Sequence, residues 1–182
     1  MANLITLARI LLVVPFAAMF FIDWAFAPTV ALVLFVVAAA SDFLDGWVAR
    51  ARGEVSALGA ALDPVADKLL VAAALLLLVR NGVIRDAAVV AALAILLREI
   101  FVGGLREALG ARARVLPVTA LAKWKTAAQL VAIGLLLAAA PGGPAPGLGP
   151  VAQGLFWFAA VLTLWTGADY ARRGVAALRA PG

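Results

Sequence analysis

The chain has 182 residues, of which 66% are hydrophobic and only 14% are charged, and its net charge is +5 at pH 7. Soluble domains are nearer about 45–50% apolar and about 25% charged, so this composition excludes a soluble domain and indicates an integral membrane protein. Cysteine and histidine are absent, which excludes disulfides, thiolate ligands and imidazole catalysis. On a membrane protein, excess positive charge favours contact with anionic lipid, and we expect no nucleic-acid partner.

Six apolar segments follow one another along the chain, each close to the ~20 residues that cross a bilayer core. They are residues 4–22, 27–48, 57–79, 87–105, 125–140 and 151–168. Backbone polar groups in lipid must be satisfied within the segment, and the alternating pattern of barrel strands is missing, so we expect helices. No linker separates a second domain. The sequence therefore predicts an all-α membrane protein, with residues 1–182 forming one bundle of six transmembrane helices.

Basic residues are concentrated at one set of segment ends. The opposite loops carry only Arg80 and Arg85. Because cytoplasmic loops carry the excess of lysine and arginine, this asymmetry predicts that both termini are cytoplasmic. The protein is expected in the cytoplasmic (inner) membrane, with its active site facing the cytosol. The ten residues at the cytoplasmic ends are Arg50, Arg52, Arg106, Arg112, Arg114, Lys123, Lys125, Arg172, Arg173 and Arg179.

Four aspartates lie close together in otherwise apolar sequence, at Asp42, Asp45, Asp63 and Asp67. An aspartate at the centre of a membrane helix costs roughly 2.5–3.5 kcal/mol by insertion scales, so such residues are functional candidates. Spacings of three and four residues place each pair on one helical face. Carboxylates brought together in this way are expected to bind hard divalent cations, either Mg²⁺ or Mn²⁺. Two such ions would suit phosphoryl displacement.

Pro64 interrupts the second aspartate pair. Proline is best tolerated in the first turn of a helix, where its missing N–H group costs least. We therefore expect Asp63 to cap a helix that begins at this point, with residues 57–62 forming a bend.

Small residues and one arginine accompany the aspartates, namely Gly46, Ala49, Arg50 and Gly59. Glycine inside a helix costs about 1 kcal/mol relative to alanine. Close packing of membrane helices is one explanation for such residues. The other is that missing side chains admit a nucleotide or a phosphate to the backbone, where Arg50 would bind the phosphate bidentately.

In order, these positions resemble the signature of the CDP-alcohol phosphotransferase family: Asp42-x2-Asp45-Gly46-x2-Ala49-Arg50-x8-Gly59-x3-Asp63-x3-Asp67. The resemblance implies a six-helix membrane fold, usually a homodimer, that transfers a phosphatidyl or similar group from a CDP-linked donor to an alcohol and releases CMP. It also implies roles for individual residues. The metal ligands are Asp42, Asp45, Asp63 and Asp67, with Asp67 also the catalytic base, and the CDP-binding residues are Gly46, Ala49, Arg50 and Gly59.

Charged residues reappear in the fourth apolar segment, at Arg98 and Glu99. An arginine at this depth needs an anionic partner. Either Glu99 or Glu107 would serve as a structural partner, whereas the phosphate of an acceptor alcohol would be a functional one. The predicted basic pocket for that phosphate consists of Arg98, Arg106, Lys123 and Lys125.

Most of the chain also resembles one subfamily, the phosphatidylglycerophosphate synthases. This resemblance implies CDP-diacylglycerol as the donor and sn-glycerol 3-phosphate as the acceptor. The matching stretches are residues 3–9, 62–70, 98–107 and 122–129.

Other functions remain open at this point. The same chemistry with phosphatidylglycerol as the acceptor would make a cardiolipin synthase, and inositol phosphate is another candidate acceptor. Membrane carboxylates also occur in cation transporters, which need a polar path to the outer face, but residues 24–40 and 69–79 contain only Thr29 as a polar residue. A non-catalytic scaffold would need more neighbouring bases to neutralise four aspartates.

Overall fold

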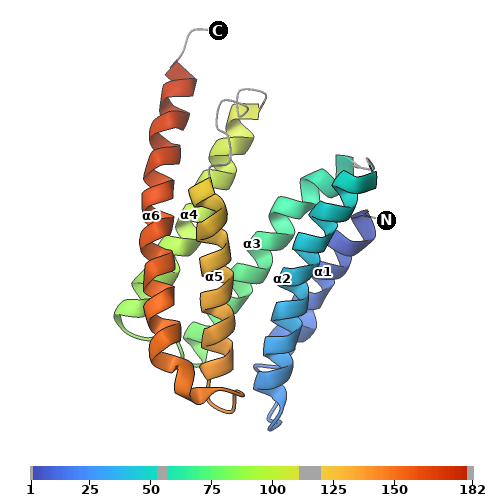
Figure 1. Ribbon diagram of the computed structural model, residues 1–182, viewed down its shortest axis with the longest axis vertical. Helices are drawn as coiled ribbons and strands as arrows, with labels where there is room; N and C mark the ends of the chain where they lie inside the picture. The colour runs from blue at the N-terminus through green and yellow to red at the C-terminus, as the bar shows by residue number, and fades with distance from the viewer. Residues whose placement is uncertain (1, 53–56, 111–119, 180–182) are drawn as a thin grey trace.

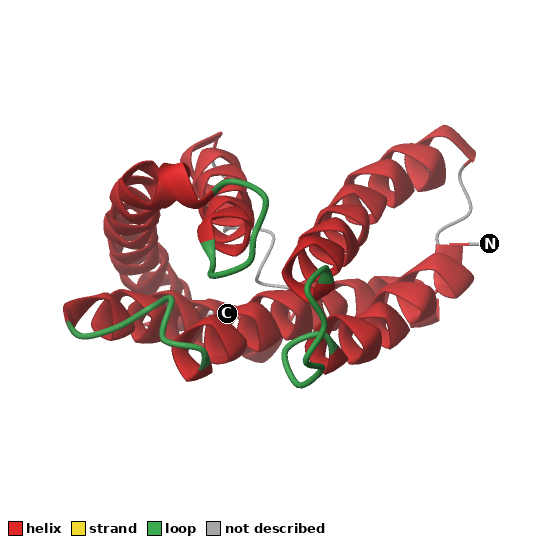
Figure 2. Cartoon of the chain, turned by 90° about the horizontal axis from the view of Figure 1, so that it is seen from below, coloured by secondary structure: helices red, strands yellow, loops and turns green. Residues whose placement is uncertain are grey.

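A computed structural model describes the backbone of residues 2–52, 57–110 and 120–179, and the side chains of residues 7–41, 65–66, 68–110 and 121–176. Within these residues all regular secondary structure is helical, and turns connect the helices (Figures 1 and 2). The elements are α1 (Ala2–Ala18), α2 (Ala27–Arg52), α3 (Ala57–Arg80), α4 (Ala87–Leu109), α5 (Ala120–Ala139), the short 3₁₀-helix η2 (Pro146–Leu148) and α6 (Gly149–Arg179).

Each predicted apolar segment coincides with one of these helices, but some ends differ. α1 stops at Ala18 because the following residues form tight turns, in which the Phe21 backbone N–H donates to the Ala18 carbonyl over 3.0 Å. α6 continues to Arg179, well beyond the apolar stretch. Its polar end contains an exposed i,i+4 ion pair at 3.0 Å between Arg173 and Asp169, a spacing that favours the helix in water.

The predicted bend before Pro64 is wrong. α3 is continuous from Ala57 to Arg80 and therefore passes through the proline. Membrane helices tolerate internal proline because neighbouring helices and local adjustments satisfy the carbonyl group that loses its donor. Helix α1 likewise contains Pro15 in its interior.

The helices form two groups of three. α1 packs against α2 and α3, whereas α6 packs against α4 and α5. Contacts of α2 with α5, and of α3 with α4 and α5, join the groups. α1 begins at the end of the bundle at which α6 ends, and the two groups diverge toward that end (Figure 1). Helix directions alternate along the chain (Figure 1), and the side of the membrane that each end of the bundle faces stays a prediction.

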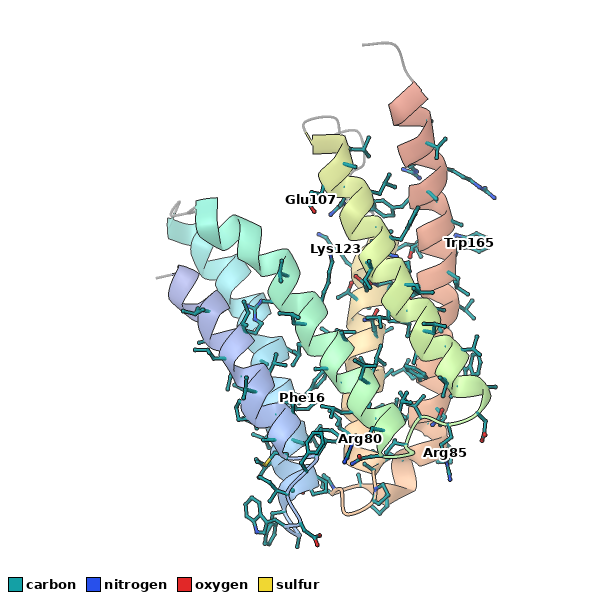
Figure 3. All side chains as sticks on the ribbon, turned by 180° about the vertical axis from the view of Figure 1, so that it is seen from behind. Phe16, Arg80, Arg85, Glu107, Lys123 and Trp165 are labelled. Carbon is teal, nitrogen blue, oxygen red and sulfur yellow. The ribbon has the colours of Figure 1, made fainter. Side chains whose placement is uncertain are left out.

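One apolar core extends through both groups, while large apolar side chains also cover the outside. Trp124 and Trp165 are both 72% exposed, and Trp165 points away from the bundle (Figure 3). Three helical segments have the length and composition to cross a bilayer, at Ala87–Leu109, Leu121–Ala139 and Pro146–Ala176. The chain is therefore a membrane protein. Fully buried core residues, one from each helix, are Phe16, Phe35, Leu78, Ile95, Ile133 and Phe156.

The turn between α5 and η2 depends on two glycines. Gly142 has a φ of 76°, a left-handed value that glycine adopts without strain. Gly143 donates its backbone N–H to the Ala140 carbonyl over 2.8 Å, and a Cβ atom at Gly143 would overlap the carbonyl oxygens of Ala138 and Ala140. Because these are backbone atoms, the overlap cannot be relieved by rotating a side chain.

We expect Gly143→Ala to lower the free energy of unfolding by about 1–3 kcal/mol, the usual cost of forcing extra atoms into a packed site. Gly154→Ala in α6 is the matched control, because a Cβ atom there meets nothing within 4 Å. Thermal unfolding of the two variants in detergent measures the difference. Equal melting temperatures would contradict the prediction.

Candidate active site

The four aspartates lie on two helices joined by a short connection. Asp42 is ten residues before the end of α2, and Asp67 is ten residues after the start of α3. At ~1.5 Å per residue, each lies about 15 Å from its helix end, so the two backbones bring both pairs to the same depth. The aspartate side chains lie outside those that the structure describes, and their coordination of metal stays a prediction. Four carboxylates are a donor set that fits hard divalent cations.

The predicted nucleotide-binding residues lie on the same two helices. Gly46, Ala49 and Arg50 occupy the last two turns of α2, and Gly59 occupies the first turn of α3. They too lie outside the side chains that the structure describes. Their contact with the CDP group stays a prediction.

The described part of the site centres on the Glu99 carboxylate of α4. Lys125 in α5 donates from Nζ to Glu99 Oε1, and Arg98 donates from Nη1 to the same oxygen over 3.2 Å. Lys125 is 2% exposed, so its charge is compensated inside the bundle. Glu99, one of the two carboxylates expected as a structural partner of Arg98, therefore contacts it.

Arg98 also contacts α6. Its Nη2 donates to Thr166 Oγ1 over 3.4 Å, and its side-chain stem passes against Gly167, where a Cβ atom would come within 2.8 Å of Arg98 Cγ. Thr166 in turn donates to the Leu162 carbonyl over 2.8 Å, which fixes the hydroxyl that receives the arginine. Arg98 thus has its guanidinium group held between α4 and α6.

Tyr170 in α6 is a site residue that the sequence did not reveal. It is 4% exposed, and Arg106 Nη2 donates to its hydroxyl oxygen over 3.3 Å. The guanidinium carbons of Arg98 and Arg106 lie 5.7 Å and 5.4 Å from its ring centroid, which places both arginines against one aromatic ring. The only available signal was that Tyr170 is the sole tyrosine of the chain and lies in the polar end of α6.

We use the term basic cluster for Arg98, Arg106, Lys125, Glu99 and Tyr170. Arg98 and Lys125 both contact the Glu99 carboxylate, and Arg106 contacts Tyr170. The formal charges of these five side chains, three positive and one negative, sum to +2, an excess of two positive charges within the cluster itself. Such an excess in a mostly buried position favours binding of an anion.

Lys123, the fourth residue of the predicted pocket, is exposed, in contrast to Lys125. In Figure 3 it lies at the same end of the bundle as Glu107, and Arg80 and Arg85 lie at the other end. Its contact with an acceptor stays a prediction.

A cavity of about 380 Å³ lies at the end opposite to the basic cluster, among the turns that follow α1, α3 and α5. Its charged lining residue is Asp23, and its lining includes the amide of Asn81, whose Oδ1 accepts a hydrogen bond from Arg80 over 2.9 Å. Because none of the described residues that line this cavity is basic, it does not suit a phosphate.

Comparison with known proteins agrees with the family that the motif indicated. The family model described as CDP-alcohol phosphatidyltransferase matches residues 1–165. Three similar relatives are each named CDP-diacylglycerol–glycerol-3-phosphate 3-phosphatidyltransferase. The protein of Cereibacter sphaeroides is 45% identical over 74% of this chain and 61% of its own length. Those of Rickettsia typhi and Salmonella typhimurium are 36% and 39% identical over 92% of this chain, and over 93% and 91% of their own lengths. The chain therefore belongs to the CDP-alcohol phosphatidyltransferase family.

Proposed function

We propose that this protein transfers the phosphatidyl group of CDP-diacylglycerol to sn-glycerol 3-phosphate, giving phosphatidylglycerophosphate and CMP. The observation that favours a phosphate-bearing acceptor is the basic cluster. Its side chains have a net formal charge of +2, which suits an anion. The names of the relatives supply the donor and the acceptor.

In the proposed reaction, Asp67 accepts the proton of an acceptor hydroxyl group. The hydroxyl oxygen then forms a bond to the phosphorus that bears diacylglycerol, and the bond from that phosphorus to the CMP oxygen breaks. A correctly placed base contributes typically 10²- to 10⁴-fold to such a step. The chain contains no histidine, so this role falls to a carboxylate.

Asp42, Asp45, Asp63 and Asp67 are proposed to hold two divalent cations, Mg²⁺ or Mn²⁺. When bound, such ions neutralise charge on the phosphate oxygens during displacement. Gly46, Ala49, Arg50 and Gly59 are proposed to bind the CDP group from the adjacent turns of α2 and α3. The small residues Gly46, Ala49 and Gly59 would leave the backbone accessible to the nucleotide, and Arg50 would bind a phosphate.

The acceptor phosphate is proposed to bind at Arg98, Arg106, Lys123 and Lys125. Glu99 orients two of these cations before substrate arrives, which lowers the entropy lost on binding. The excess of basic residues at these helix ends supports a cytosolic active site, where glycerol phosphate is available. A homodimer in the inner membrane is the proposed assembly.

Replacing Asp67 with Asn tests the base. We expect at least a 100-fold loss of CMP release, because the amide cannot accept the proton. Binding of CDP-diacylglycerol should persist. Asp86→Asn, in the turn before α4 at the other end of the bundle, is the matched control and should keep full activity. Retained turnover in Asp67→Asn would refute this role.

Removal of divalent cations tests the metal site. Chelation with EDTA should abolish CMP release, and added Mg²⁺ or Mn²⁺ should restore it, because the four aspartates would otherwise repel one another and the donor diphosphate. Activity that persists after exhaustive chelation would contradict the proposed metal site.

Replacing Lys125 with Met tests the acceptor site. A charge-assisted hydrogen bond contributes about 1.5–3 kcal/mol, so KM for glycerol 3-phosphate should rise about 10- to 100-fold while KM for CDP-diacylglycerol is unchanged. Arg85→Gln, which removes a cation at the opposite end, is the control.

The same assay with phosphatidylglycerol and inositol phosphate identifies the acceptor. Turnover with one of these alcohols, but none with glycerol 3-phosphate, would overturn the proposed acceptor and leave the family assignment intact.

A further inference from the structure

Lys68 in α3 is a cation that the proposed chemistry has not yet used. It directly follows Asp67, and its side chain is partly buried. Within the side chains that the structure describes, Lys68 has neither a hydrogen-bond partner nor an ion-pair partner. A lysine inside a membrane helix is costly, and such residues commonly mark a functional site.

The Lys68 side chain crosses from α3 to the surface of α4 at Gly103. A Cβ atom built on Gly103 would overlap Lys68 Nζ and lie 3.0 Å from Lys68 Cε, so the ammonium group occupies the space that a larger residue would fill. The next residue, Gly104, differs sharply, because a Cβ atom there meets nothing within 4 Å. Only the first of these adjacent glycines therefore makes room for the lysine.

Gly103 lies on the face of α4 that belongs to the basic cluster. It is four residues after Glu99 and three residues before Arg106, and residues at these spacings are neighbours on a helix surface. The ammonium group of Lys68 therefore lies on the α4 face between the turn that binds Lys125 and the turn that contacts Tyr170. It adds a further cation to this face of α4.

We infer that Lys68 is a further binding residue for the phosphate of the acceptor, approaching it from α3 while the basic cluster approaches from α4, α5 and α6. The inference rests on the proposed function. Because Lys68 is adjacent to the proposed base in sequence, one turn of α3 would both bind the acceptor phosphate and receive the proton of its hydroxyl group. Gly103 would act as a positioning residue, since it determines where the ammonium group lies.

The first test replaces Lys68 with Met, which keeps most of the apolar stem and removes the charge. We expect KM for glycerol 3-phosphate to rise about 10- to 100-fold, the loss of one charge-assisted contact. KM for CDP-diacylglycerol and the melting temperature in detergent should be unchanged. A rise in the donor KM instead would overturn the inference, because it would assign Lys68 to the diphosphate. An unchanged acceptor KM would also overturn it.

The second test uses the adjacent glycines as a matched pair. Gly103→Ala should raise the acceptor KM in the same direction as Lys68→Met, because the new methyl group displaces the ammonium group. Its melting temperature should stay within experimental error, because a flexible lysine tip moves aside easily. Gly104→Ala should leave the acceptor KM and the melting temperature unchanged.

A double variant separates positioning from a direct effect of the glycine. If Gly103 acts through Lys68, Gly103→Ala should have no further effect on the acceptor KM in a Lys68→Met background. Additive effects would contradict the positioning role. Failure of the wild-type protein to release CMP with glycerol 3-phosphate would instead refute the proposed function, so the two failures are distinguishable.

Discussion

The position of the buried cations in this membrane protein depends on the Glu99 carboxylate. One of its oxygens accepts hydrogen bonds from both Arg98 and Lys125, and Lys125 is almost fully buried. A buried cation without such a partner would cost several kcal/mol, so the carboxylate permits lysine and arginine inside an apolar bundle. Because Arg98 also donates to Thr166, this network joins α4 to α5 and to α6. The same residues that hold the helices together therefore keep an excess of positive charge in place.

Glycines on neighbouring helices leave space for two cations, Arg98 and Lys68. Gly167 admits the stem of Arg98 to the surface of α6, and Gly103 admits the ammonium group of Lys68 to the surface of α4. In membrane proteins, small residues commonly allow two helix backbones to approach closely. Here they allow a long charged side chain to lie flat against a neighbouring helix. For Arg98, the apolar stem is then covered, while the guanidinium group stays beside Glu99 and Thr166.

The sequence predicted the parts of this structure that depend on local pattern. Apolar runs located all six helices, because a bilayer demands a minimum length. Helix ends were less predictable, as Pro64 illustrates. A proline inside a helix is tolerated because of packing against other helices, and the residues next to it in the sequence do not reveal that packing. The same limit applies to the basic cluster. Tyr170 comes from α6 and meets residues of α4 only through tertiary packing, so no sequence spacing could indicate it. Likewise, the spacing of the aspartates predicts that each pair lies on one face of its helix, but it does not predict how they coordinate a metal.

Charge also bears on which acceptor the site selects. A phosphate monoester carries close to two negative charges at neutral pH, with a second pKa of about 6, whereas the diester of phosphatidylglycerol carries one. The basic cluster has an excess of two positive charges, and Lys68 adds another, so a monoester is better matched than a diester. Glycerol 3-phosphate and inositol phosphate are both monoesters, and the names of the relatives favour the former. On this view α4, α5 and α6 select the acceptor by its charge, α2 and α3 carry out the transfer, and Lys68 connects the two.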